Sequence, residues 1–502
     1  MPYNVIRIQQ PAGPGMKPVG QELIYVYSCI DAVQNELNVK YVFILGQQFN
    51  LGISATPIGQ FKTTPNNVGV GMMELSNLMS SYVGADNMSR RNSTWKDNAS
   101  AGLPVPIHII DKYSQNSNAV NGISVSCQVE YTDSSGTQQT AKGVTSNLWI
   151  IMNAYVKNNE PIFFTNNLNS GAPYGGGYDM QKFEMSTANF TAGNYGKFLS
   201  NSPTTQWARP NDYGTMAYIQ ISDFSIDQSN RFCDVSYYKF TFYPKYDAGG
   251  TIVHSTIVEK TAGNGAFTGT NTTETSPDGI NDLINHLLYF GAFPANIKAI
   301  DSDFNTKVGT DILSYTVETY NTSNERLSET RIVNIACADH KGYEPIRLTW
   351  LNQWGTWDYY TFMQKSIKTI KTKGATYNPT SIEWNKEFST PSGASYNGGK
   401  KSFRVNATET IKMNTDYVTE EHSEWFEELI NSPEVYQLRE RYGARTYSQG
   451  FFSPVVMPTM NEYVTPVTLK TTSLVKKTSA NDGLVQYTFE VEKSRELKTQ
   501  TV

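Results

Sequence analysis

Few side chains in this sequence carry a charge. Asp, Glu, Lys and Arg together make up 17% of the 502 residues, and the formal net charge is −5. A nucleic-acid partner requires a basic stripe that neutralises phosphates, so this balance argues against DNA or RNA as a partner. Charged side chains also keep the surface of a monomer soluble. Their scarcity favours a surface that is partly covered by other subunits.

Long hydrophobic runs are also missing. The longest apolar stretch, Leu148 to Val156, is too short to span a bilayer, and residues 1–4 lack the basic start and apolar run of a signal peptide. We therefore expect a protein that is made in the cytoplasm and used as a soluble species, without a membrane as its partner.

Cysteine is rare as well. Cys29, Cys127, Cys233 and Cys337 lie far apart in strand-like runs. They have none of the paired spacing that zinc or redox sites require. We interpret them as small buried hydrophobic residues and expect no metal and no cofactor.

Aromatic residues and turn formers are abundant instead. Aromatics make up 12% of the chain, with 31 Tyr and 23 Phe, and much of the remainder is Asn, Thr, Ser and Gly. This composition is typical of strands and turns. A chain of this length is expected to form roughly two to four domains. The sequence therefore predicts a mainly β fold with a minor α+β character: several β-sandwich-like modules with a few short helices.

Alternating patterns predict hairpins at several places. Apolar residues alternate with polar ones from Ile123 to Tyr131, and Asp133 to Gly136 supplies a turn. Similar patterns of strand, polar turn and strand occur at 238–250, at 315–324 and around 481–483. The segment Ile346 to Phe362 predicts two strands joined by a turn at Asn352 to Gly355.

Helical periodicity is limited to three segments. Apolar residues share one helical face in 75–83, in 280–288 after Ser276-Pro277, and in about 419–431, which has an acidic first turn and ends at Ser432-Pro433. Gly-rich stretches at 262–278 and 389–401 read as linkers. We expect an N-terminal module over 1–160, a β-rich middle region over 161–275, a second module opened by a helix over 276–400, and a helix with a β-hairpin over 401–502.

Motifs that carry chemistry are not found. The segment 394–401 approaches a phosphate-binding loop but has Ala394 and Lys401 at two required positions. The acidic cluster 420–428 lacks the histidine spacing of a zinc protease, so a solvated helix face is the better interpretation. The histidines are scattered singly, and Asp301 with Asp303 is a pair by sequence proximity only. We expect no enzyme and assign no catalytic residue.

The aromatic segment is the most distinctive part of the chain. Trp350, Trp354, Trp357 and Tyr359 lie on or beside the predicted hairpin at 346–362. They are candidates for packing in a core, for contact with another subunit, or for stacking on a sugar. All three interpretations stay open from the sequence.

Several segments act as landmarks along the chain: Lys40–Phe43 leading to Gly71–Ser76, Lys197–Pro203, Tyr289–Asn296, Leu348–Phe362, Trp425–Val435, and Pro466–Lys470 followed by a hairpin through Gly483. In pattern and order they resemble a family of largely uncharacterised structural proteins encoded by tailed bacteriophages of marine and Bacteroidetes-type hosts. The stretch 166–183 has no counterpart among these landmarks. Its Tyr174 and Tyr178 are further candidates for subunit contact on a variable loop, and a plain solvent loop or disorder is the alternative.

The resemblance implies a virion component of the tail, the tail tip or baseplate, or the neck, and no enzymatic activity. Its partners would be other virion subunits, including copies of itself in a ring. The alternative is a receptor-binding tail fibre or spike that recognises a glycan on the host surface. A glycosidase on a β scaffold is the remaining alternative, and it would require two convergent carboxylates in a cleft.

Overall fold

The computed structural model shows a chain built mostly of β-strands, with a few short helices between them. The mainly β class with sandwich-like modules is thereby confirmed. The structure describes residues 3–11, 16–47, 56–89, 105–110, 113–146, 149–157, 163–165, 175–177, 180–183, 185, 195–219, 235, 237–244, 254–259, 287–321, 323–336, 342–379, 382–385, 390–393, 399–439, 463–475, 485–495 and 497.

The chain divides into two compact units. The first contains Met1–Ala338, Trp350–Tyr360 and Glu440–Met460, and the second contains Asp339–Thr349, Thr361–Arg439 and Asn461–Val502. The four ranges expected from linker composition do not coincide with these units. The expected boundaries near 160 and 275 fall inside the first unit, and the one near 400 falls inside the second.

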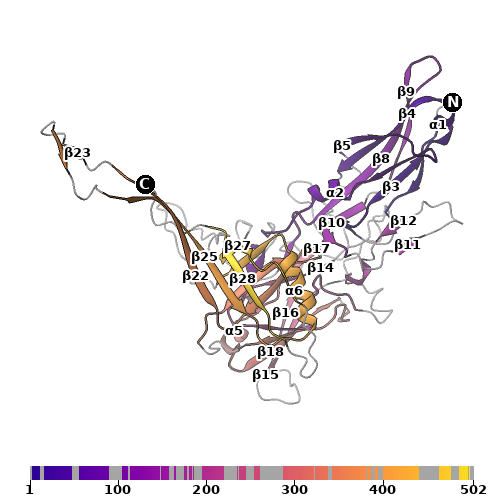
Figure 1. The fold of residues 1–502 in the computed structure, drawn as a ribbon. Coiled ribbons are helices and arrows are strands. Elements are labelled where there is room, and N and C mark those ends of the chain that lie inside the picture. The colour runs from indigo at the N-terminus through magenta and orange to yellow at the C-terminus, as the bar shows by residue number, and fades with distance from the viewer. Residues whose placement is uncertain are drawn as a thin grey trace, which may run out of the picture. The chain divides into compact units, whose positions relative to one another are not determined.

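The N-terminal part of the first unit holds a six-stranded and a three-stranded sheet (Figure 1). The larger sheet has the order β2 (Lys17–Gly20), β10 (Trp149–Tyr155), β8 (Val120–Thr132), β4 (Leu37–Gln47) and β5 (Thr56–Thr63), with β9 (Gln138–Thr145) paired to β8. The smaller sheet has the order β1 (Ile6–Gln9), β3 (Ile24–Ser28) and β6 (Val70–Glu74). Short helices accompany these sheets: α1 (Ile30–Asn35), α2 (Ser76–Met79) and η1 (Ser80–Tyr82).

Alternation along β8 explains where the core of these sheets lies. Ile123, Val125, Cys127 and Val129 are all fully buried on one face, where they join Tyr27, Phe43 and other apolar side chains of one cluster. The polar residues between them point to the other face because successive strand residues alternate. The predicted hairpin at 123–136 is confirmed, since β8 pairs antiparallel with β9.

The remainder of the first unit holds two more main sheets. One has the order β13 (Thr205–Ala208), β19 (Arg331–Ile335), β18 (Ile312–Tyr320), β15 (Tyr237–Pro244) and β16 (His254–Glu259), and the other has β14 (Thr215–Ile219), β17 (Leu287–Gly291) and β7 (Tyr113–Gln115). Two helices follow β17, namely α4 (Pro294–Ile300) and α5 (Ser302–Lys307). Smaller elements are η2 (Ile107–Ile109), η3 (Gln181–Phe183) and the pair β11 (Phe163–Thr165) with β12 (Gly175–Gly177).

The second unit is built on one seven-stranded sheet. Its order is β21 (Trp357–Phe362), β20 (Ile346–Leu351), β26 (Val435–Leu438), β27 (Val464–Leu469), β28 (Thr488–Lys493), β25 (Lys401–Asn414) and β22 (Ile367–Tyr377). The unit assignment changes within β20 and within β21, so the turn between them belongs to the first unit. Two further elements are the helix α6 (Glu421–Asn431) and the pair β23 (Ile382–Asn385) with β24 (Thr390–Gly393).

One predicted helix is partly wrong. Leu287 and Leu288, the end of the helix expected over 280–288, lie in β17, and the earlier residues of that prediction fall outside the described residues. All five residues of β17 are buried between β14 and β7. A strand that is covered on both faces shows a continuous apolar run, and a short run of this kind cannot be distinguished from a buried helix by periodicity.

The linker expected at 389–401 is partly wrong, because Thr390–Gly393 form β24 and β25 begins at Lys401. Several other local predictions agree with the structure. The segment 75–83 forms α2 and η1, and 419–431 contains α6. The strands predicted at 238–242, 315–317 and 346–362 are present. Cys29 and Cys127 are buried, whereas Cys233 and Cys337 lie outside the described residues.

Candidate functional site

The four aromatic candidates of the hairpin are buried within this chain. Trp350, Trp354, Trp357 and Tyr359 expose 0%, 1%, 3% and 3% of their surface. Packing in a core accounts for this burial, and no appreciable surface of the four remains for another subunit or a sugar. Tyr174 and Tyr178, the two candidates on the loop at 166–183, lie outside the described residues.

The turn between β20 and β21 is held by one amide side chain. Asn352 Oδ1 accepts hydrogen bonds from the backbone N–H groups of Trp354 (3.0 Å) and Thr356 (3.1 Å). Its Nδ2 donates to the carbonyl oxygen of Leu199 at 2.8 Å, and the Thr356 hydroxyl donates to the same oxygen at 2.6 Å. The landmark segment 197–203 and the hairpin turn are therefore fastened to each other.

Trp354 makes further contacts between the turn and other segments of the first unit. Its indole N–H donates to Asn201 Oδ1 at 3.1 Å, its ring packs on Phe183 at 4.6 Å between centroids, and the Lys182 ammonium lies 5.2 Å from the ring centroid. An indole that is buried in this way contributes both apolar area and a satisfied donor. The geometry explains why a tryptophan occupies this position.

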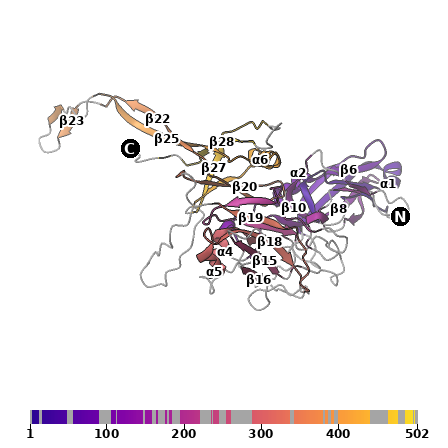
Figure 2. The same cartoon turned by 90° about the horizontal axis from the view of Figure 1, so that it is seen from below.

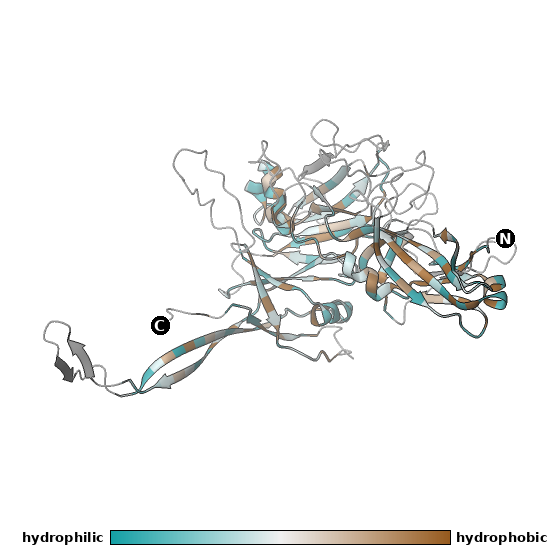
Figure 3. Cartoon of the chain, turned by 90° about the horizontal axis from the view of Figure 1, so that it is seen from above, coloured by the Kyte–Doolittle hydropathy of each residue, from teal (hydrophilic) through white to brown (hydrophobic). Residues whose placement is uncertain are grey.

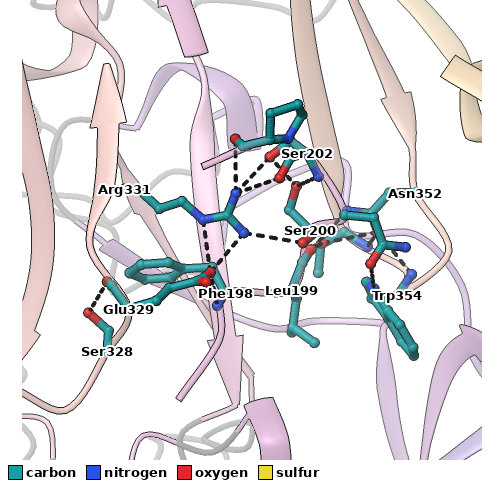
Figure 4. A network of polar contacts seen from close by, with 12 residues as sticks. Phe198, Leu199, Ser200, Ser202, Ser328, Glu329, Arg331, Asn352 and Trp354 are labelled. Carbon is teal, nitrogen blue, oxygen red and sulfur yellow. Dashed lines mark hydrogen bonds and ion pairs between the residues drawn. The ribbon is translucent and has the colours of Figure 1, made fainter. Parts of the chain in front are cut away.

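Arg331, the first residue of β19, holds the same segment from the other side (Figure 4). Its guanidinium donates to the carbonyl oxygens of Ser202 (2.7 Å), Pro203 (3.2 Å) and Ser200 (3.3 Å), and to the Ser202 hydroxyl (3.1 Å). It also forms a 2.7 Å ion pair with Glu329. Arg331 is only 4% exposed, so its charge is offset within the protein by the carboxylate and the carbonyls.

The side chains around Arg331 leave little free space. The cavity lined by Arg331, Asp358, Tyr359 and their neighbours has a volume of about 20 Å³, which accommodates about one water molecule. Ligand pockets for small molecules are more than ten times larger. Arg331 therefore acts here as a structural clamp on the segment 197–203.

A second group of buried polar side chains surrounds Trp357 and Tyr359 of β21. The Tyr359 hydroxyl is 2.8 Å from His108 Nδ1 and 2.9 Å from the Thr215 hydroxyl, and Trp357 donates its indole N–H to the carbonyl oxygen of Asp86 at 2.8 Å. These side chains are almost completely buried. Proton transfer to a substrate requires access to that substrate, and the burial of these groups favours a role in the core.

The carboxyl group of Asp86 is the most strongly perturbed acid of this group. Its burial raises its pKa to about 6, although hydrogen bonds from the backbone N–H groups of Asn118 and Ser117 oppose that shift. Burial likewise raises the pKa of Tyr289 well above its usual value. A perturbed acid of this kind can indicate a catalytic site. Here Asp86 is completely buried, so its raised pKa reflects its position in the core.

Among the residues that the structure describes, no group of three or more His, Cys, Asp or Glu side chains is placed to hold a metal ion. The acidic cluster at 420–428 forms the start of α6, in which Glu428 is buried and Glu421 is exposed. None of the helices in the described ranges is long and apolar enough to cross a membrane.

The most exposed ordered feature is the hairpin formed by β22 and β25 in the second unit. All eleven residues of β22 are exposed. β25 pairs with β28 only from Thr410 to Asn414, so β22 and β25 continue beyond the sheet as two strands (Figure 1, Figure 2). We call residues 370–377 and 400–408 the ribbon. Within the described residues, the ribbon pairs with another segment only at the isolated β-bridge between Ala407 and Leu497.

Apolar side chains on this ribbon are largely exposed. Ile370, Phe403, Val405 and Tyr377 are 61%, 58%, 47% and 41% exposed. Figure 3 shows apolar and polar segments alternating along the two strands. An isolated two-stranded hairpin is only marginally stable in water, and its edges present unpaired backbone groups. The ribbon is therefore the described surface best suited to a macromolecular partner.

Sequence reasoning did not identify this surface. The sequence did contain a signal, because residues 367–377 are rich in the β-branched residues Ile and Thr and contain no acidic residue. Such a run predicts a strand, but whether both of its faces remain exposed depends on which strands pair beside it.

Comparison with models of known protein families finds no family that matches the chain, and comparison with curated proteins finds no relative.

Proposed function

We propose that this protein is a non-enzymatic structural component of a tailed-phage virion, located in the tail, the tail tip or baseplate, or a neck ring. It acts by assembling with other virion subunits after synthesis in the host cytoplasm. The observation that carries the assembly role is the exposed ribbon. The resemblance of the landmark segments to phage structural proteins supports the virion as its place.

The physical argument for assembly concerns the solvation of the ribbon. A two-stranded segment that exposes Ile370 and Phe403 on opposite faces gains stability when a partner removes those side chains from water. Its edges can also accept a strand from a neighbouring subunit. Most of the chain's other large aromatics in the described structure lie in its core, as Trp354 does, and serve the fold.

The alternative function is a receptor-binding fibre or spike that recognises a host glycan. Stacking on a sugar requires exposed aromatic rings. The four aromatic candidates of the hairpin at 346–362 are buried, so this alternative would depend on other residues, such as Trp207 at 56% exposure. The assembly role is the function that the described surface favours.

The test is to locate the protein in particles. Virions of the encoding phage are purified, their proteins are identified by mass spectrometry, and an antibody against the recombinant chain is localised by electron microscopy. We expect a constant copy number and labelling at the tail or neck. Absence from intact particles would refute the virion role, and labelling of peripheral fibres together with binding of host polysaccharide would replace assembly by receptor binding.

A further inference from the structure

The two faces of the ribbon differ in chemistry. Directly opposed residues of paired strands share a face. Lys371 faces Thr408, Lys373 faces Asn406 and Ala375 faces Arg404, so these three basic side chains lie on one face. Tyr377 has the same alternation as the two lysines, and Phe403 contacts its ring edge-on at 6.2 Å between centroids. This basic face thus ends in an exposed aromatic pair.

The opposite face is uncharged apart from Glu409, which lies across from Ile370. It also carries Ala407 and Val405, across from Thr372 and Gly374, and we call it the apolar face. Ile370 and Val405 are 61% and 47% exposed. Glu409 is only 8% exposed and is paired with Lys493 Nζ at 2.6 Å, and the other side chains of this face are no longer than isoleucine, which suits close approach of another β surface.

Charge separates the ribbon from the remainder of the chain. Residues 370–377 and 400–408 contain five basic residues, Lys371, Lys373, Lys400, Lys401 and Arg404, and no acidic one. Removing these five from the 41 Lys and Arg of the chain leaves 36 against 46 Asp and Glu, which is a net charge of −10 outside the ribbon. Opposite charge draws protein surfaces together and fixes their orientation.

We propose that the ribbon docks on a second copy of this chain, with its basic face against acidic surface of that copy and its apolar face covered in the same contact. The proposal rests on the assembly function above and names its partner. A contact between an arm of one copy and the body of the next is heterologous, so repetition of it produces a ring when the rotation closes. Association is expected to weaken as salt screens the charges.

A basic ribbon with aromatic side chains can also bind nucleic acid. Two observations favour the protein partner. First, phosphate binding does not explain why the apolar side chains of Ile370 and Val405 are exposed on the opposite face. Second, the chain outside the ribbon has a net charge of −10, which repels a polyanion but attracts the ribbon of another copy.

The experiment measures self-association of the full chain by light scattering and sedimentation velocity at low and at high salt. The test variant carries Lys371→Glu, Lys373→Glu and Arg404→Glu, which changes the charge of the ribbon from +5 to −1. All three residues are exposed strand residues, so the fold should persist. We expect wild-type oligomers at low salt that dissociate as salt rises, and at least tenfold weaker association of the variant.

The matched control reverses three exposed lysines elsewhere, Lys40→Glu, Lys142→Glu and Lys197→Glu. It has the same total charge as the test variant, so it reports any effect of net charge alone. We expect association close to that of the wild type, because the ribbon is unchanged.

Three results would overturn the proposal. They are a wild-type chain that stays monomeric at low salt and tens of micromolar, a test variant that associates as the wild type does, and salt-dependent binding of duplex DNA by the wild type that the test variant loses without any change in self-association. Each of these leaves the localisation in particles unaffected. Failure of the docking proposal is therefore distinguishable from failure of the virion role.

Discussion

Gly355 offers a sharp test of how the hairpin turn is seated. Its backbone has φ of +72°, and a Cβ built on it would lie 1.7 Å from the carbonyl oxygen of Asn153 in β10. Gly136, in the exposed turn between β8 and β9, has a φ of +80° and no atom within 4 Å of its Cβ position. The two glycines share the left-handed conformation and differ in what surrounds them.

The expected magnitudes follow from this difference. Alanine in the left-handed region costs roughly 1–2 kcal/mol, and both Gly355→Ala and Gly136→Ala carry that cost. At Gly355 the new methyl group must also displace the backbone of β10, where Tyr155 N–H donates to the carbonyl oxygen of Gln353 at 2.8 Å. Overpacking of that kind costs about 1–3 kcal/mol, and a lost buried hydrogen bond about 1 kcal/mol. We expect Gly355→Ala to destabilise by roughly 2–4 kcal/mol more than Gly136→Ala.

A chain of two units need not unfold in one step. Hydrogen exchange measured by mass spectrometry in increasing urea is therefore the suitable assay, because it reports the opening free energy of the β10 peptide itself. Equal losses of protection at β10 in Gly355→Ala and Gly136→Ala would contradict the contact with Asn153.

Three further predictions concern buried charged and titratable groups. Arg331→Lys should destabilise the first unit by roughly 2–4 kcal/mol in urea unfolding, because an ammonium cannot reach all the carbonyls that the guanidinium fork binds; a loss below about 1 kcal/mol would contradict the clamp. Asp86 has a folded pKa of about 6 against an ordinary 3.8. Its contribution to stability is therefore largest at low pH, and roughly 3 kcal/mol of it is lost as the pH rises from about 4 to about 6. The stability of the wild type minus that of Asp86→Asn should decline over this pH range, and a difference that does not change with pH would refute the prediction. Burial lowers the pKa of His422 to about 4, so NMR titration should find its ring neutral down to that region, and a midpoint near 6.5 would show that the ring is solvated. Since His422 is depressed below its unfolded value, its contribution is lost as the pH falls through the range from 6.5 to 4, in the opposite sense to Asp86.

Local sequence patterns were sufficient to predict elements that have one solvent-exposed face. The alternation from Ile123 to Tyr131 indicates a half-buried strand because polar residues mark the solvent side, and β8 has this form. The turn at Asn352 to Gly355 could be predicted because glycine adopts a positive φ, here +72°, more readily than other residues. The same logic failed at Leu287 and Leu288, where both faces of β17 are covered and no polar residue marks a side.

The candidate site was harder to predict for a different reason. Trp350, Trp354 and Trp357 had to be buried somewhere, but a sequence does not say whether the cover comes from the same chain or from another. Here the chain supplies the cover, and the contacts of Trp354 come from Phe183 and Asn201, more than 150 residues away in sequence. The exposed surface lies instead at Phe403 and Ile370, whose residue types do not differ from those of core strands.

By itself, the sequence determined the β class, the positions of several strands and turns such as β8, β15, β18, β20 and β21, and the scarcity of charge, because these depend on side-chain periodicity and composition over short distances. Only the tertiary structure decided which aromatics are enclosed, which carbonyls Arg331 holds, and which strands lack a neighbour. Those properties depend on pairing between segments far apart in the chain. One example is the ribbon, where β22 and β25 continue beyond the last residue of β28 without a third strand among the described residues.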